Sequence, residues 1–126
     1  MIRISLNDIL NATETFKVIM QQSVKGSLAF KIARLARELD KEMTTFNEER
    51  QKLFQKYGEK DENGELVIDE NNIIKFPPEN IDLINEELNS LLSTEVEVNA
   101  DKLPVNEVDQ FELTPQQMMN IEMFFE

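Results

Sequence analysis

One uninterrupted amphipathic stretch, residues 27–58, constrains the fold more than any other feature of the sequence. It reads SLAFKIARLARELDKEMTTFNEERQKLFQKYG, and Gly58 stands where a helix C-cap is expected. Most of its polar residues are good helix formers. Its apolar residues recur at steps of three, four or seven, at Leu28, Ile32, Leu35, Leu39, Met43, Phe46, Leu53 and Tyr57. This pattern predicts a helix of about 30 residues, roughly 45 Å long, which should protrude or pack against a partner.

A shorter helix is expected before it, over residues 6–21. Ser5 can cap this helix, and apolar residues then recur at helical spacing as far as Met20. Gly26 interrupts the pattern before the long helix begins. Residues 1–57 are therefore predicted to form a helical hairpin.

The rest of the chain mixes strands and helices. Residues 65–68 and 73–76 (ELVI and IIKF) predict a β-hairpin, which the alternating segment TEVEV could join as a third strand. Pro78 opens one further helix, and Thr114 with Pro115 opens another. We expect a single α+β domain over residues 1–126, with a long N-terminal helical hairpin in 1–57, and a small antiparallel sheet and two further helices in an acidic α/β part, 58–126.

Charge separates these two parts. The net charge is −12, made of +3 in residues 1–57 and −15 in residues 58–126. Most of this surface would repel phosphate, so we expect no direct binding of nucleic acid, and a basic partner is favoured. No apolar run is long enough to span a bilayer, so no membrane association is expected.

The residue types that perform most enzyme chemistry are missing. The chain contains no cysteine and no histidine, and its three glycines are far apart. Thiolate catalysis, zinc ligation and a glycine-rich phosphate loop are thereby excluded. We predict that the protein is not an enzyme and needs no cofactor.

Residues 59–70, EKDENGELVIDE, partly match a calcium-binding loop with Gly64 at its sharp turn. Asp61, Asn63 and Glu70 would then be the oxygen ligands. Glu59 is longer than the usual first ligand, however, and no helix follows the loop. The alternative interpretation, which we favour, is an Asn63–Gly64 turn that leads into a strand.

Partner contacts are predicted on two helices. The apolar face of the long helix would contribute Ile32, Leu39, Phe46 and Leu53. The terminal segment MMNIEMFFE would contribute Met119, Met123 and Phe124, although Met and Phe at helical spacing also close cores. An exposed stripe of this length needs covering, so we expect a homo-oligomer.

Three segments resemble a group of small uncharacterised proteins from bacteriophages and prophages of Gram-positive bacteria. They are residues 28–68 (LAFKIAR to GELVI), then PENIDLINEELNSLLSTEVEV, then LTPQQMMNIEMFFE. The resemblance implies a phage protein in the host cytoplasm or the virion that works by binding proteins of phage or host. It supplies no active-site residues.

The hypothesis that combines these observations is a non-enzymatic phage protein–protein interaction module, acting in virion assembly or as a tail-associated accessory protein. A second hypothesis is an acidic inhibitor that mimics nucleic acid and blocks a host defence nuclease or another nucleic-acid enzyme. Its contacting charges would be Glu95, Glu97, Asp101, Glu107, Asp109 and Glu112. A third is a calcium-binding module built on residues 59–70.

Overall fold

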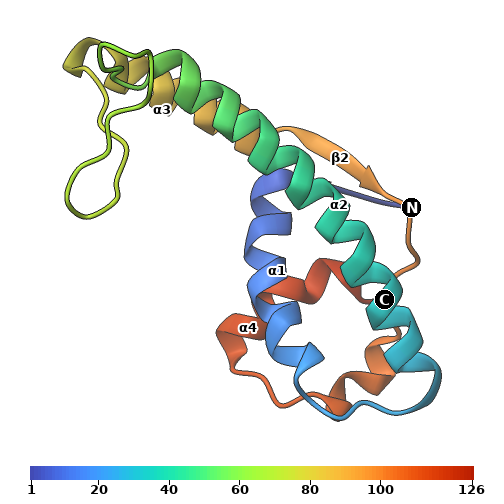
Figure 1. Ribbon diagram of the computed structural model, residues 1–126. Helices are drawn as coiled ribbons and strands as arrows, with labels where there is room; N and C mark the ends of the chain where they lie inside the picture. The colour runs from blue at the N-terminus through green and yellow to red at the C-terminus, as the bar shows by residue number, and fades with distance from the viewer. The chain divides into compact units, whose positions relative to one another are not determined.

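The computed structural model describes all 126 residues and confirms the α+β class (Figure 1). The elements, in chain order, are β1 (Ile2–Ser5), α1 (Leu6–Met20), α2 (Gly26–Tyr57), α3 (Pro78–Leu92), β2 (Glu95–Val98), the 3₁₀ helix η1 (Val105–Gln110), α4 (Pro115–Ile121) and the 3₁₀ helix η2 (Glu122–Phe124). The expected helices are present, and the longest begins one residue earlier than the expected stretch, at Gly26. None of the helices is both long enough and apolar enough to cross a membrane.

The residues predicted to begin three of the helices occupy those positions in the structure. The Ser5 hydroxyl accepts a hydrogen bond from the Asp8 backbone N–H at 3.1 Å, which satisfies an otherwise unpaired donor of α1. Thr114 and Gln117 form a complete capping box at the start of α4. Pro78 occupies the first position of α3, where its missing N–H costs nothing.

The sheet consists of the two strands β1 and β2, which pair antiparallel. Ile2 lies opposite Val98, both are buried, and Arg3 lies opposite Glu97 on the exposed face. Residues 95–98 therefore pair with the N-terminal strand and not, as expected, with a hairpin at 65–76. The N-terminal strand offers Ile2 and Ile4 as an apolar face, and pairing with β2 buries both of them.

The chain folds into two compact units, and α2 contributes residues to each of them. The first unit contains residues Met1–Thr44 and Thr94–Glu126, and the second contains Thr45–Ser93. The sequence-based boundary at residue 57 falls inside the second unit. The charge change marks the end of a helix, whereas the boundaries of the units follow tertiary contacts.

The core of the first unit joins the two ends of the chain. α1 packs closely against α4, and Figure 1 shows these two helices side by side. The Phe16 ring meets the Phe124 ring edge to face, with 5.6 Å between centroids. The backbone around Leu103 exchanges hydrogen bonds with the final residues, accepting from the Glu126 N–H at 3.0 Å. The prediction that the terminal aromatics close the core is confirmed for Phe124, which is fully buried.

Within the second unit, residues 60–75 form two similar turns rather than a hairpin of two regular strands. Isolated bridges pair Lys60 with Leu66 and Ile68 with Ile74. The two turns repeat a sequence pattern, KDENGELV at 60–67 and IDENNIIK at 68–75. We did not anticipate this eight-residue repeat from the sequence.

Each turn is organised by its aspartate. Asp61 Oδ1 accepts backbone hydrogen bonds from Asn63 and Glu65 at 2.8 and 3.1 Å. In the second turn, Asp69 Oδ1 accepts the equivalent bonds from residues 71 and 73 at 2.9 and 3.0 Å. Gly64 and Asn72 follow at φ angles of +77° and +64°, the left-handed conformation that this type of turn requires. The turns are therefore alike in sequence, hydrogen bonding and backbone angle.

Gly58 follows the last residue of α2, but it does not act as the glycine C-cap that the sequence predicted. Its φ is not positive, so the left-handed cap is not formed. A Cβ at this position would lie 2.5 Å from Leu66 Cδ2 and 2.6 Å from the Phe54 carbonyl oxygen. Gly58 is thus required by the close approach of Leu66 to the end of the helix.

Candidate functional site

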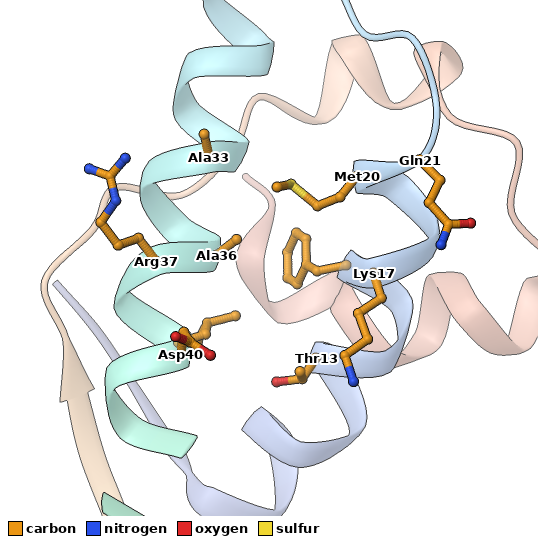
Figure 2. A pocket seen from close by; sticks show the side chains of 10 residues that line it. Thr13, Lys17, Met20, Gln21, Ala33, Ala36, Arg37 and Asp40 are labelled. Carbon is orange, nitrogen blue, oxygen red and sulfur yellow. The ribbon is translucent and has the colours of Figure 1, made fainter. Parts of the chain in front are cut away.

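A cavity lies between α1 and the first part of α2, and both of its walls belong to the first unit (Figure 2). It has a volume of about 610 Å³. Its lining residues are Thr13, Phe16, Lys17 and Met20 on α1, Gln21 at the C-cap of α1, and Ala33, Ala36, Arg37, Leu39 and Asp40 on α2. We call this cavity the α1–α2 groove.

α1 packs most closely against elements other than α2. Its close backbone neighbours are β1 and α4, and α2 is not among them. On the facing side of α2, Ala33 and Ala36 carry only methyl groups, so they do not fill the gap. Phe16 and Leu39 are almost completely buried and form an apolar floor.

Two large apolar side chains remain exposed beside this floor. Met20 is 57% exposed and extends between the two helices in Figure 2. Phe30 is 77% exposed and precedes Ala33 by one helical turn on α2. Met20 lines the groove, and Phe30 lies on α2 one helical turn before the lining begins, so two large apolar side chains are exposed at or near this groove.

Charged groups border the groove on both helices. Lys17 lies on α1, with its Nζ 3.6 Å from Glu14 Oε1 in an exposed pair. Arg37 and Asp40 lie on α2, and Figure 2 shows the Arg37 guanidinium directed away from α1. The Thr13 hydroxyl donates to the Ile9 carbonyl at 2.8 Å, so its proton is engaged within α1. The groove is therefore apolar inside and charged at its edges.

Comparison with protein-family models, with curated proteins and with solved structures finds no match to this chain. The account of its function consequently rests on the groove itself and on the placement of the residues that the sequence singled out.

Most of the predicted partner contacts are occupied inside the protein. Ile32, Leu39, Phe46 and Phe124 are all buried, with at most 4% of each exposed. Ile32, Phe46 and Phe124 are not available to a partner in this structure, whereas Leu39 forms part of the floor of the groove. Leu53 and Met123 are half-buried, and Met119 is 60% exposed. Of the predicted contacts, only Met119 presents a largely free apolar side chain.

The predicted calcium ligands are not arranged around a common point. One oxygen of Asp61 is committed to two backbone N–H groups, and Glu70 belongs to the second turn rather than the first. No group of three or more acidic side chains in the structure could hold a metal ion. The geometry agrees with the turn interpretation of residues 59–70.

The six carboxylates proposed as a nucleic-acid mimic are exposed except for Glu107, which is half-buried. They do not form an uninterrupted negative array. Arg3 on β1 pairs with Glu95 at 2.9 Å and lies opposite Glu97 in the sheet, so a cation stands among the acids of β2. This placement weakens the comparison with evenly spaced phosphates.

The sequence reading missed the residues that shape the groove. It followed the apolar stripe of α2 and therefore passed over Phe30, Ala33 and Ala36, which lie on another face. One signal was present: Phe30 is a large aromatic residue outside the stripe of a helix that is otherwise polar on that side. The small size of the two alanines becomes informative only when the position of α1 is known.

Proposed function

We propose that this protein is a non-enzymatic interaction module that binds an amphipathic helix of another protein in the α1–α2 groove. The observation that carries the proposal is the exposure of Met20 and Phe30 beside an apolar floor between two helices. Helix-in-groove binding uses this arrangement, with apolar side chains of the incoming helix inserted between two fixed helices.

The dimensions of the groove support this occupant. Its lining runs over residues 13–21 of α1 and its C-cap and residues 33–40 of α2, which is roughly 11–12 Å, or two helical turns. Side chains spaced i, i+4 and i+7 along one helix cover that length. Phenylalanine, methionine and arginine, all present at its edges, are enriched at protein interfaces.

The polar groups of the groove support binding rather than catalysis. A nucleophile needs a base within hydrogen-bonding distance, and the chain has neither histidine nor cysteine. Thr13 is the only hydroxyl in the lining, and it donates to its own helix. Lys17, Arg37 and Asp40 are placed as edge charges, which orient a partner.

The biological setting of this proposal comes from the resemblance to phage and prophage proteins. That resemblance favours virion assembly, or a tail-associated accessory role, in the host cytoplasm or the virion. The partner would then be a protein of the phage or of its host. Self-association remains a prediction, and its original reason is weaker because the long apolar stripe of α2 is largely buried.

The proposal can be tested with a synthetic helical peptide of about 18 residues that has leucine at i, i+4, i+7 and i+11 and uncharged glutamine and alanine elsewhere. Fluorescence anisotropy would measure its binding to the full chain. We expect binding that is lost in Ala36→Trp, which fills the groove, and weakened at least about tenfold in Phe30→Ala. Phe30 is exposed, so this second variant should keep its stability.

The matched control is Val105→Ala, which removes another exposed apolar side chain of the first unit outside the groove. It should bind the peptide as the unmodified protein does. The proposal would be overturned if the unmodified protein did not bind the peptide at concentrations up to about 1 mM. It would also be overturned if Ala36→Trp and Phe30→Ala both bound the peptide as tightly as the unmodified protein does.

A further inference from the structure

Two arginines beside the groove have no ionic partner within the chain. Arg34 and Arg37 are exposed and stand one helical turn apart on α2, on the same ridge as Phe30. Neither forms an ion pair, although the chain has 25 acidic residues and only 13 basic ones. They are two of the eight basic residues that take part in none of the five ion pairs, and they stand next to each other on one ridge of α2.

The nearest acids do not neutralise them. On the far side of the ridge, Arg34 and Arg37 border a second, more polar cavity of about 390 Å³, to which Glu38 and Asp101 also contribute. Glu38 pairs instead with Lys41 at 2.9 Å, and Asp101 makes no ion pair. The guanidinium donors of the ridge therefore remain available to a group from outside the chain.

The opposite edge of the groove is also cationic. Lys17 on α1 has Glu14 as its ionic partner, but the 3.6 Å separation and the exposure of both side chains make that pair weak. Asp40 is the one acid in the lining, against Lys17 and Arg37. The cations at the groove are thus Lys17 on α1 and Arg37 on α2, with Arg34 one turn before Arg37, in a molecule with a net charge of −12.

We infer that the helix bound in the α1–α2 groove is acidic on both flanks, with carboxylates that pair with Lys17 on one side and with Arg34 and Arg37 on the other. This inference rests on the proposed function and adds the chemistry of the partner. Carboxylates are the natural ligands of a planar guanidinium, which can hold them through two parallel hydrogen bonds. The remaining acidic surface would repel an acidic helix elsewhere, so the same charges direct it to this groove.

The experiment compares two charged versions of the leucine peptide described above, one with glutamate and one with lysine at every flanking position. Their affinities for the full chain would be measured at about 50 mM and about 500 mM salt. We expect the glutamate peptide to bind at least about tenfold more tightly than the lysine peptide at low salt, with the difference shrinking at high salt. Arg34→Glu combined with Arg37→Glu should abolish or reverse the preference.

The control for charge reversal is Lys102→Glu, an exposed lysine of the first unit that does not line the groove. It should leave the preference unchanged. Equal affinity for the two peptides, or no effect of the arginine reversals, would overturn the acidic partner while leaving the groove as a helix-binding site. If the unmodified protein bound neither of the two peptides, that result would instead overturn the proposed function.

Other occupants give their own results. Dodecanoate, an apolar chain with one carboxylate, would overturn the inference if it bound in the micromolar range and no peptide bound. A second copy of this chain would be identified by sedimentation as a dimer that dissociates in Arg37→Glu, and this result would also overturn the inference. A monomer that binds the glutamate peptide supports it.

Discussion

The Phe16 and Phe124 rings meet edge to face beneath the α1–α2 groove, with 5.6 Å between their centroids. Phe16 lines the groove from α1, and Phe124 supports it from η2 near the chain terminus. Phe16 in the floor of the proposed binding site is therefore packed against a segment more than 100 residues away in the sequence. This contact links the stability of the first unit to the shape of its groove.

Replacing Phe124 with alanine should destabilise the protein strongly. The side chain is fully buried, and truncation of a buried phenylalanine typically costs about 3–5 kcal/mol. Urea unfolding followed by circular dichroism would measure the change in the free energy of unfolding. Met119→Ala, at an exposed position of the neighbouring α4, should change it by less than about 0.5 kcal/mol. Similar effects of the two substitutions would contradict the packing described here.

The paired turns predict which glycine can be replaced. Asn72 adopts in the second turn the left-handed angle that Gly64 adopts in the first, so Gly64→Asn should change the unfolding free energy by less than about 0.5 kcal/mol. Gly64→Val should cost about 1–2 kcal/mol, because a β-branched residue is strained at that angle.

Gly58→Ala should lower the free energy of unfolding by about 1–3 kcal/mol, because the added Cβ would overlap with Leu66 and with the Phe54 carbonyl oxygen. Urea midpoints of the three variants would give their order of stability. A Gly58→Ala variant as stable as Gly64→Asn would show that the chain does not approach the end of α2 so closely.

In the second unit, one side-chain hydrogen bond joins α2 to α3, and deleting a single oxygen atom removes it. The Tyr57 hydroxyl donates to Glu87 Oε1 at 2.7 Å, so Tyr57→Phe should cost about 1 kcal/mol in unfolding free energy. The pKa of Lys56 is raised above the ordinary 10.5. The main cause is the Tyr57 hydroxyl, and the Glu87 carboxylate makes a smaller contribution. The variant should therefore lower the Lys56 pKa, which a ¹³C NMR titration of the lysine side chain would detect.

The direction of the pH effect follows from that raised pKa. Folding favours the protonated lysine, so this contribution to stability is complete below pH 10.5 and is lost as the pH rises through the raised pKa. An unchanged Lys56 pKa in Tyr57→Phe would show that the hydroxyl is not its cause.

Calcium should not stabilise the protein. The Asp61 carboxylate is engaged by two backbone N–H groups, and the structure brings no three acidic side chains together at residues 59–70. Differential scanning fluorimetry with millimolar calcium or with EDTA should give the same melting temperature. A rise of more than about 2 °C that disappears in Asp61→Asn would restore the calcium hypothesis.

Local signals in the sequence predicted the helices well. Ser5, Thr114 and Pro78 act through neighbouring backbone groups, so their sequence positions were sufficient to place three helix starts. The pairing of β1 with β2 joins residues 2–5 to residues 95–98, and no local pattern specifies a contact at that separation.

The candidate site was less predictable for the same reason. The sequence could show that α2 is amphipathic, but it could not show that its apolar face is covered within the chain. The predicted contacts Ile32 and Phe46 are therefore buried away from the groove, and of the predicted contacts on α2 only Leu39 lines it. The groove lies between α1 and α2, and the close packing of α1 against α4 rather than α2 is a long-range relationship that the sequence does not show.

Methyl NMR offers the most direct test of the groove. The six methionines and the alanines report on separate surfaces: Met20, Ala33 and Ala36 line the groove, whereas Met118, Met119 and Met123 lie near the C-terminus. Titration with the glutamate-flanked leucine peptide should shift the methyl signals of Met20, Ala33 and Ala36 and leave that of Met119 unchanged. Shifts at Met119 without shifts at Ala33 and Ala36 would contradict the account and return the binding site to the terminal helix.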